Sequence, residues 1–326
     1  MREYKVFAGS SGKEFAEKMC EYLGITLGSS EVFKFSEGNI FVKVNETVRQ
    51  KDVYIVQPMG LTPNDDLVEI LFWLDALQRS SARSVTVVMP YFSYAKGDKK
   101  DEPRTSIRAR VCAECMELAG ADHVITMDLH SPQIQGFFKR QVDNLFAMPL
   151  LAEYITHMKL DNFVIASPDA GYAKQARLFA DKLGVDVVIG DKSRKGHDEN
   201  AEILQLIGDV KDKNVVIVDD FSISGGTLAD MCRMLKKHGA KQVFACLSHA
   251  LLSQKGLDRI NNSEIEFVMT TDTINNPLIK DQKKFRIVSA APLFAEAVDR
   301  INRGDTVSEI TKKLPTRILE YIDNEK

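Results

Sequence analysis

Two long stretches of the chain, about 160 residues apart, repeat one order of strand and helix patterns. Residues 52–92 predict a buried strand, a polar loop, an amphipathic helix and a second buried strand, and residues 214–250 predict the same order with a shorter helix. Upstream of them, residues 5–24 and 162–184 each predict a strand, a glycine-containing turn and a helix that ends at a glycine. A chain of 326 residues with such a repeat is expected to form two domains of similar fold.

Short apolar strand cores alternate with helical patterns along the chain. These cores are residues 53–56, 85–89, 124–127, 164–166, 187–189 and 215–218. The alternation predicts an α/β fold of two duplicated domains, each a mainly parallel sheet flanked by helices. We place the domains at residues 1–146 and 147–326, with the last helix packing back on the first domain. Ligands of such folds bind beyond the carboxyl ends of the strands, so site residues are expected directly after the strands.

Composition excludes several classes of protein. The net charge is −3, far from the basic excess of a dedicated nucleic-acid binder. No apolar run approaches the roughly 20 residues that span a bilayer, and the first residues lack the apolar core of a signal peptide. Five scattered cysteines favour a reducing compartment, and Cys112 and Cys115 are expected to be helix residues without a metal, because no second ligand pair lies near them in sequence. We therefore expect a cytoplasmic protein with no nucleic-acid or membrane partner.

The strongest site signal follows the strand core at residues 215–218. Asp219 and Asp220 stand at its end, and a loop of small residues then leads into a helix. The small residues are Ser222, Ser224, Gly225, Gly226 and Thr227. Such residues let a backbone approach an anion closely, helix-terminal amides attract the anion, and hydroxyls add donors. We expect a phosphate in this loop and the hydroxyls of an attached sugar at the aspartates; the alternative is an ordinary turn capped by Ser224 or Thr227.

Other polar residues stand at other predicted strand ends. His130 follows one strand of the first half and Asp169 follows one strand of the second half, and together they could hold Mg²⁺ directly or through water. The alternative for His130 is a purely structural histidine. Two basic segments, residues 94–104 and 192–200, are either solvated loops or contacts to phosphates. The second of them is expected to precede a helix at residues 201–208.

Many segments of the chain resemble ribose-phosphate diphosphokinases, the phosphoribosyl pyrophosphate synthetase family. They include FSEGN at 35–39, PYFSYAKGDKKD at 90–101, GADHVITMDLHSPQIQGFF at 120–138, SPDAG at 167–171, VVIVDD at 215–220 and APLFAEAVDRINRGDTVSEI at 291–310. The resemblance implies two phosphoribosyltransferase-like domains, a homo-oligomer (a hexamer or its dimer unit) and dependence on Mg²⁺. It also implies transfer of the diphosphoryl group of ATP, as co-substrate, to the C1 hydroxyl of ribose 5-phosphate, with release of AMP.

On the ATP side, the resemblance implies that Phe35 stacks on adenine and that Glu37 contacts the adenine amine. Lys96 stands in the family's ATP segment. Asp101 and His130 would lie near ATP and Mg²⁺, and His130 would take part in both metal binding and catalysis. These roles come from the matching motifs.

On the sugar side, the resemblance implies that Asp169 holds Mg²⁺ and the sugar end of the acceptor. Lys192 and Arg194 would close over the migrating diphosphoryl group. The adjacent aspartates Asp219 and Asp220 would bind ribose hydroxyls, and the loop of small residues that follows them would hold the 5-phosphate.

The resemblance further implies a regulatory anion site at a subunit interface, with activation by phosphate and inhibition by ADP. The matching positions are Thr47, Arg49, Arg104, Gln135, Asp143, Asn144 and Ser308. Lys139 and Arg140 depart from the family's usual residues beside this set. The interface at this position is therefore expected to differ in detail.

Two departures bear on the substrates. Lys96 and Gly97 replace the arginine and glutamine that are common in the ATP segment, so a point charge replaces a planar guanidinium. Ile223 replaces an acidic residue that usually faces the sugar, which lessens charge repulsion and adds apolar surface. The acceptor is therefore ribose 5-phosphate or, alternatively, a ribose-5-phosphate ester such as ADP-ribose. A catalytically silent regulatory subunit is the alternative from a different class, and the retained His130 and Asp169 argue against it.

Replacing Lys192 or Arg194 by Ala is expected to lower turnover at least about 100-fold while the fold persists, because one well-placed donor to a transition state is typically worth about 2.7–4 kcal/mol. Steady-state AMP release measures the loss, and circular dichroism checks the fold. Near-normal turnover in either variant contradicts the assignment of that residue.

Overall fold

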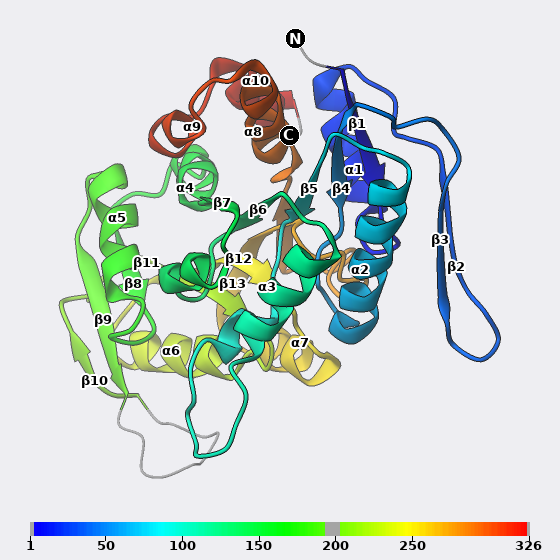
Figure 1. Ribbon diagram of the computed structural model, residues 1–326. Helices are drawn as coiled ribbons and strands as arrows, with labels where there is room; N and C mark the ends of the chain where they lie inside the picture. The colour runs from blue at the N-terminus through cyan, green and yellow to red at the C-terminus, as the bar shows by residue number, and fades with distance from the viewer. Residues whose placement is uncertain (1–2, 193–202, 325–326) are drawn as a thin grey trace. The chain divides into compact units, whose positions relative to one another are not determined.

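The computed structural model describes residues 3–192 and 203–324, and its contacts divide the chain into two units (Figure 1). Unit 1 comprises Met1–Phe146, Thr273–Asn275 and Ser289–Lys326, and unit 2 comprises Ala147–Asp272 and Asn276–Val288. The contacts therefore group all of residues 289–326 with unit 1, whereas the sequence pattern expects only the last helix there.

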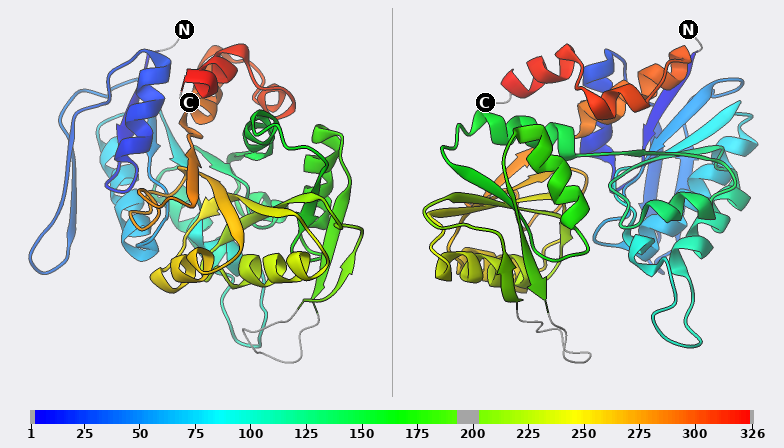
Figure 2. Two further views of the ribbon diagram at one scale, coloured as in Figure 1. Left: turned by 180° about the vertical axis from the view of Figure 1, so that it is seen from behind. Right: turned by 90° about the vertical axis from the view of Figure 1, so that its left-hand side faces the viewer.

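Unit 1 is built on a five-stranded parallel sheet. Its elements are β1 (Tyr4–Ala8), α1 (Lys13–Leu23), β2 (Ser30–Lys34), β3 (Ile40–Val44), β4 (Asp52–Val56), α2 (Pro63–Arg79), β5 (Ser84–Met89), η1 (Ser93–Gly97), α3 (Arg108–Ala119), β6 (His123–Met127), η2 (Pro132–Phe137), β7 (Gln141–Leu145), α8 (Ala291–Arg303), α9 (Ser308–Lys312) and α10 (Thr316–Asn324). The order across the sheet is β1-β4-β5-β6-β7. β2 and β3 form a separate antiparallel hairpin, which extends as a long ribbon beside α2 (Figures 1 and 2).

Unit 2 is built on a seven-stranded sheet. Its elements are α4 (Met148–His157), β8 (Phe163–Ser167), α5 (Ala173–Leu183), β9 (Val187–Lys192), β10 (Ile203–Ile207), β11 (Asn214–Ser222), α6 (Gly226–Lys237), β12 (Gln242–Ala250), α7 (Gln254–Asn261), β13 (Ile265–Thr271) and β14 (Phe285–Val288). The order is β10-β9-β8-β11-β12-β13-β14, and every pair is parallel except β10 with β9.

The two sheets confirm the duplication and the α/β class. Strands β1, β4, β5, β6 and β7 of unit 1 correspond, in chain order and in sheet position, to β8, β11, β12, β13 and β14 of unit 2. The helix after the first strand of each unit also ends at the predicted glycine, Gly24 for α1 and Gly184 for α5. In each unit an antiparallel strand pair follows that helix, β2–β3 in unit 1 and β9–β10 in unit 2.

The prediction of a helix at residues 201–208 is wrong. Ile203–Ile207 forms β10 and pairs antiparallel with β9. The pattern of apolar residues in this short stretch fits a helix turn as well as a strand, so periodicity alone does not decide between them. Pairing with β9 satisfies the backbone groups of the segment and settles the conformation as a strand.

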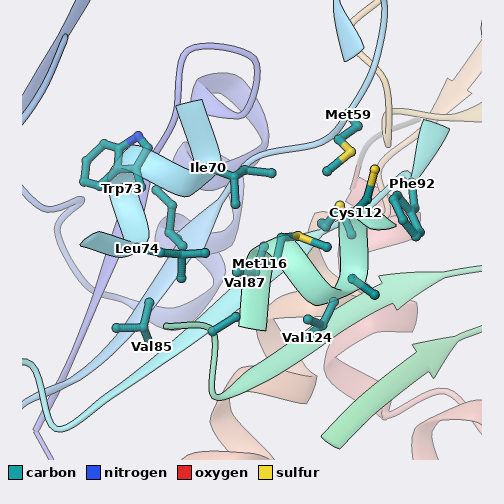
Figure 3. Close-up of a cluster of buried hydrophobic side chains, with 14 of the residues drawn as sticks. Met59, Ile70, Trp73, Leu74, Val85, Val87, Phe92, Cys112, Met116 and Val124 are labelled. Atoms are coloured by element: carbon teal, nitrogen blue, oxygen red, sulfur yellow. The ribbon is translucent and has the colours of Figure 1, made fainter. Parts of the chain in front are cut away.

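The core of unit 1 lies between one face of its sheet and the helices α2 and α3. Trp73 and Leu74 of α2 and Met116 of α3 point toward sheet residues such as Val85 and Val87 (Figure 3). Helix α1 packs against α8 in the same unit. In the described ranges, no helix is long and apolar enough to cross a membrane.

Replacing Met116 by Ala is expected to lower the free energy of unfolding of unit 1 by about 2–5 kcal/mol, because the variant leaves a cavity in a packed core. Trp73, the single tryptophan, lies in this core, so its fluorescence during urea unfolding reports on unit 1. The matched control on the same helix is Leu118→Ala, whose side chain is 90% exposed and whose loss should change the free energy by less than about 0.5 kcal/mol. Equal effects of both variants would contradict this description of the core.

Candidate active site

The loop between β11 and α6 has its backbone amides open. Gly225 is the residue before the helix, with φ of +65°, a left-handed conformation that favours glycine. Within the described residues, the amides of Ile223, Ser224 and Gly225 donate to no protein acceptor, and the Gly226 amide lies 3.4 Å from Ser224 Oγ. Gly225 at the N-cap position has no side chain that could cap the helix, and the Ser224 hydroxyl accepts from the Gly226 amide at a long distance, so the alternative of a turn capped by Ser224 or Thr227 stays open beside the anion site. Open amides at a helix N-terminus form an anion-binding site.

Carboxylates lie at the ends of two neighbouring strands of unit 2. Asp219 and Asp220 belong to β11, and Asp169 follows β8, which pairs with β11. The Asp220 amide donates to Asp219 Oδ1 at 3.0 Å, and the Tyr172 amide donates to Asp169 Oδ1 at 3.2 Å. Burial, together with the negative charges of Asp220 and Asp169, raises the pKa of the Asp219 carboxyl well above its usual value. The structure therefore gathers these three predicted residues in one electrostatic group.

The predicted adenine contacts lie on the β2–β3 hairpin of unit 1. Phe35 is 46% exposed, and its ring centroid lies 5.0 Å from that of Phe33 and 6.1 Å from that of Phe41. Glu37 follows on the turn, where its Oε1 accepts from Asn39 Nδ2 at 3.2 Å. An exposed aromatic ring beside a carboxylate can stack on a base and accept from its amine.

Two neighbouring residues at the start of α2 hold both predicted ATP segments of unit 1. Lys34 Nζ of the hairpin donates to Asp65 Oδ2 at 2.6 Å, and the Tyr94 hydroxyl of η1 donates to Asn64 Oδ1. Lys96 lies in the same η1 turn and is exposed. Neither Asn64 nor Asp65 was predicted from the sequence to be a site residue. The sequence signal that could have identified them is a polar pair in the first turn of an amphipathic helix.

A buried polar network at the carboxyl ends of β1 and β4 was also missed. Asp66 and Glu69 lie on the buried side of α2. Asp66 accepts from Ser11 Oγ at 2.5 Å and from the Gly60 amide at 2.9 Å, and Glu69 accepts from the Ser10 amide at 2.8 Å. These carboxylates fix the loops that follow two strands. Their spacing of three residues among apolar positions was the available sequence signal.

Asp101 and His130 are exposed in unit 1. Asp101 Oδ1 lies 3.9 Å from Lys99 Nζ in the loop after η1. The segment that carries His130 is held in place from β7, because Asn144 Oδ1 accepts from the Leu129 amide at 3.1 Å. His130 thus stands on a fixed strand end, as the sequence predicts for a site residue.

The predicted regulatory residues fall in two groups in unit 1. Exposed residues are Thr47, Arg49, Arg104 and Ser308. Residues with internal partners are Gln135, which donates to the Pro132 carbonyl at 3.0 Å, Asp143, whose Oδ2 lies 2.9 Å from His123 Nε2, and Asn144. Their regulatory role stays a prediction.

Two predicted catalytic residues fall at the edge of what the structure describes. Lys192 ends β9, and its side chain lies outside the described part of the structure. Arg194 lies wholly outside the described residues. Cys112 and Cys115 both lie on α3, as expected from the sequence.

Comparison with known proteins bears on both units. Residues 4–120 match the family described as the N-terminal domain of ribose phosphate pyrophosphokinase, and residues 199–312 match the phosphoribosyl synthetase-associated domain. The ribose-phosphate pyrophosphokinase of Wolinella succinogenes is 43% identical over 310 residues, which are 95% of this chain and 99% of that protein. The ribose-phosphate pyrophosphokinase of Thermosipho africanus is 43% identical over 308 residues, which are 94% of this chain and 96% of that protein.

A solved structure agrees. Phosphoribosylpyrophosphate synthetase from Mycobacterium smegmatis is 33% identical and matches with a TM-score of 0.87, covering 93% of this chain and 100% of that chain. Identity at this level over nearly the full length of both proteins shows that the chain belongs to the ribose-phosphate pyrophosphokinase family.

Proposed function

We propose that this protein is a diphosphotransferase that moves the diphosphoryl group of ATP to the C1 hydroxyl of ribose 5-phosphate, giving 5-phosphoribosyl 1-diphosphate and AMP. The observation that carries the proposal is the open-amide loop at the start of α6, directly after the carboxylates of β11. The loop suits the 5-phosphate, and Asp219 and Asp220 suit the hydroxyls of the attached ribose. The names of the curated relatives support the same reaction.

The reaction requires the protein mainly to position the two substrates and to offset the negative charge of their phosphates. The C1 oxygen of the acceptor forms a bond to the β-phosphorus of ATP, the bond from the β-phosphorus to the oxygen shared with the α-phosphorus breaks, and AMP leaves. The nucleophile belongs to the substrate, so catalysis depends on alignment and on offsetting phosphate charge. Phe35 and Glu37 would bind adenine, Lys96 and Asp101 would lie along the ATP segment, and Lys192 and Arg194 would stabilise the migrating group.

Mg²⁺ fits the carboxylate oxygens at the strand ends of unit 2, and His130 of unit 1 is proposed as a further ligand. Among the described residues, no three His, Cys, Asp or Glu side chains are close enough together to hold a metal ion. Mg²⁺ in phosphoryl-transfer enzymes is usually bound by one or two carboxylates, by waters and by the phosphates of the substrate, so no complete protein cage is required. Asp169 and His130 are the proposed ligands, and a divalent cation would offset the negative charge that raises the pKa of Asp219.

A homo-oligomer, as a hexamer or its dimer unit, is part of the proposal. Exposed apolar side chains on unit 1 support it, including Phe33 and Phe41 on the hairpin and Phe72 on α2. The regulatory anion site proposed at Arg49, Arg104 and Ser308 would lie at a contact between copies.

With ATP, ribose 5-phosphate and Mg²⁺, the protein is expected to release AMP in step with the loss of ribose 5-phosphate. Chelation by EDTA should stop the release, and an excess of added Mg²⁺ should restore it. Coupled measurement of AMP and of 5-phosphoribosyl 1-diphosphate checks the reaction. Absence of AMP with every ribose phosphate tested would contradict the proposal and would support the silent-subunit alternative.

Replacing Asp219 by Asn is expected to raise stability and to lower turnover. The variant removes a carboxylate whose raised pKa shows that its charge is disfavoured in the fold, so without added Mg²⁺ the midpoint of thermal unfolding should rise at neutral pH. Stability linked to such a group is present at low pH and is lost as pH rises through the folded-state pKa, so the gain should shrink as pH falls toward 4. Turnover should fall about 10- to 100-fold, because a hydrogen bond of about 1.5–3 kcal/mol to a charged group is lost.

The matched control is Asp230→Asn on α6, whose carboxylate pairs with Arg233 at 3.0 Å near the surface. This variant should leave both the unfolding midpoint and the turnover nearly unchanged. Equal effects of the two variants would show that charge removal in general, and not the group at Asp219, is responsible.

A second acceptor is favoured by one specific observation. Ile223, in the loop itself, is 42% exposed where the family usually has an acidic residue. An exposed apolar side chain without charge tolerates a bulkier or more anionic 5′ substituent than a carboxylate does. The second candidate function is therefore the same transfer to a ribose-5-phosphate ester such as ADP-ribose.

Replacing Ile223 by Asp separates the two acceptors. Turnover with ribose 5-phosphate should change less than about threefold, whereas turnover with ADP-ribose should fall about tenfold or more, because the new charge repels the second phosphate. Parallel AMP assays with both acceptors measure the ratio. If the unmodified protein releases AMP with ribose 5-phosphate but not with ADP-ribose, the ester is eliminated as an acceptor.

A further inference from the structure

Three successive carbonyl groups of the open-amide loop between β11 and α6, which we call the phosphate loop, are held from one side. The Leu251 amide donates to the Ser222 carbonyl at 3.0 Å, and the Ser253 amide donates to the Ile223 carbonyl at 3.0 Å. Arg259 Nη1 donates to the Ser224 carbonyl at 3.1 Å. These donors come from a single stretch of unit 2, residues 251–259, which follows β12 and includes the first part of α7. This stretch supports the loop.

These three hydrogen bonds to the loop carbonyls set the direction of the open amides. In a trans peptide the carbonyl of one residue and the N–H of the next residue point in opposite directions, and no cis peptide occurs among the described residues. Because the carbonyls of Ser222, Ile223 and Ser224 point toward residues 251–259, the amides of Ile223, Ser224 and Gly225 point away from that stretch. None of these three amides donates to a protein acceptor in the described part of the chain.

The contact is close enough to require glycine on the helix. A Cβ on Gly256 would lie 2.5 Å from the Ile223 carbonyl oxygen and 3.1 Å from the Ser224 carbonyl carbon. A Cβ on Gly225 would lie 2.7 Å from the Gly256 carbonyl oxygen. Backbone packs on backbone here, so the position of α7 is transmitted directly to the loop.

Arg259 is the one member of this support that adds a full positive charge. Its Nη1 lies 3.2 Å from where a Cβ on Gly226 would stand, so the guanidinium reaches the first residue of α6 from behind the loop. Arg259 is partly buried, and its guanidinium donates to the Ser224 carbonyl. A hydrogen bond from a charged donor is stronger than a neutral one, and it holds the Ser224–Gly225 peptide in one orientation.

We propose that α7, through Arg259 and Gly256, orients the amides that bind the 5-phosphate of the acceptor, so that Arg259 is a positioning residue for that substrate. The inference rests on the proposed function. Arg259 acts through the Ser224 peptide and not by touching the substrate, so its loss should weaken binding of the acceptor and leave binding of ATP as it was.

The test compares Arg259→Gln and Arg259→Lys with Arg233→Gln, an exposed arginine of α6 that pairs only with Asp230 in the described contacts. Arg259→Gln should raise the KM for ribose 5-phosphate about tenfold or more, with the KM for ATP changed less than about twofold. Arg259→Lys keeps a charged donor and should recover part of the loss. Arg233→Gln should match the unmodified protein in both KM values.

A second variant and a second readout keep the test independent of folding and of turnover. Gly256→Ala should produce the same selective rise in the KM for ribose 5-phosphate, because its Cβ displaces the loop. The rise in thermal unfolding temperature caused by saturating ribose 5-phosphate, or by inorganic phosphate as the bare anion, should shrink in Arg259→Gln and persist in Arg233→Gln.

The possible outcomes distinguish failure of the proposed function from failure of the positioning role of Arg259. Absence of turnover in the unmodified protein, with phosphate protection that depends on Arg259, would overturn the proposed function and leave the positioning role in place. Normal turnover in the unmodified protein, with an unchanged KM and unchanged protection in Arg259→Gln, would overturn the positioning role. An equal rise in both KM values would overturn it as well, because it would show a general structural effect.

Discussion

Parallel pairing of the strands is the constraint on which the rest of the structure depends. Because neighbouring strands run in the same direction, the segments that follow them emerge at one edge of the sheet. In unit 2 this places Asp169, after β8, beside the carboxylates at the end of β11. The same strand order in unit 1 brings the loops after β1 and β4 together, where Asp66 and Glu69 of α2 bind them. One topology, used twice, therefore collects polar side chains that lie far apart in sequence.

The three carboxylates of Asp169, Asp219 and Asp220 in unit 2 disfavour the folded state, although the proposed function requires them. Burial disfavours ionisation of Asp219 and raises the pKa of its carboxyl, and the negative charges of Asp220 and Asp169 strengthen the effect. A chain selected for stability alone would place neutral residues there. Perturbed ionisation of this kind is concentrated at functional sites, where a bound cation or polyhydroxyl substrate compensates for it.

Backbone contacts, more than side-chain chemistry, shape the phosphate loop. The glycines at 225 and 256 let the loop and α7 approach until carbonyl oxygens and α-carbons are in contact. Apart from Ile223 the residues of the loop are small, and the groups proposed to face an anion are amides. An anion site of this kind depends on the direction of peptide groups, which neighbouring elements impose.

Sequence alone determined the α/β class, the duplication, the strand ends that the proposed site residues follow and the small residues of the loop after β11, because hydrophobic periodicity and runs of small residues are local signals. Tertiary structure alone decided that Ile203–Ile207 is a strand, that residues 289–324 belong to unit 1, and that Arg259 and Gly256 contact the loop. Each of these depends on which distant backbone groups satisfy one another. That choice is made by pairing and packing between segments, and no local pattern encodes it.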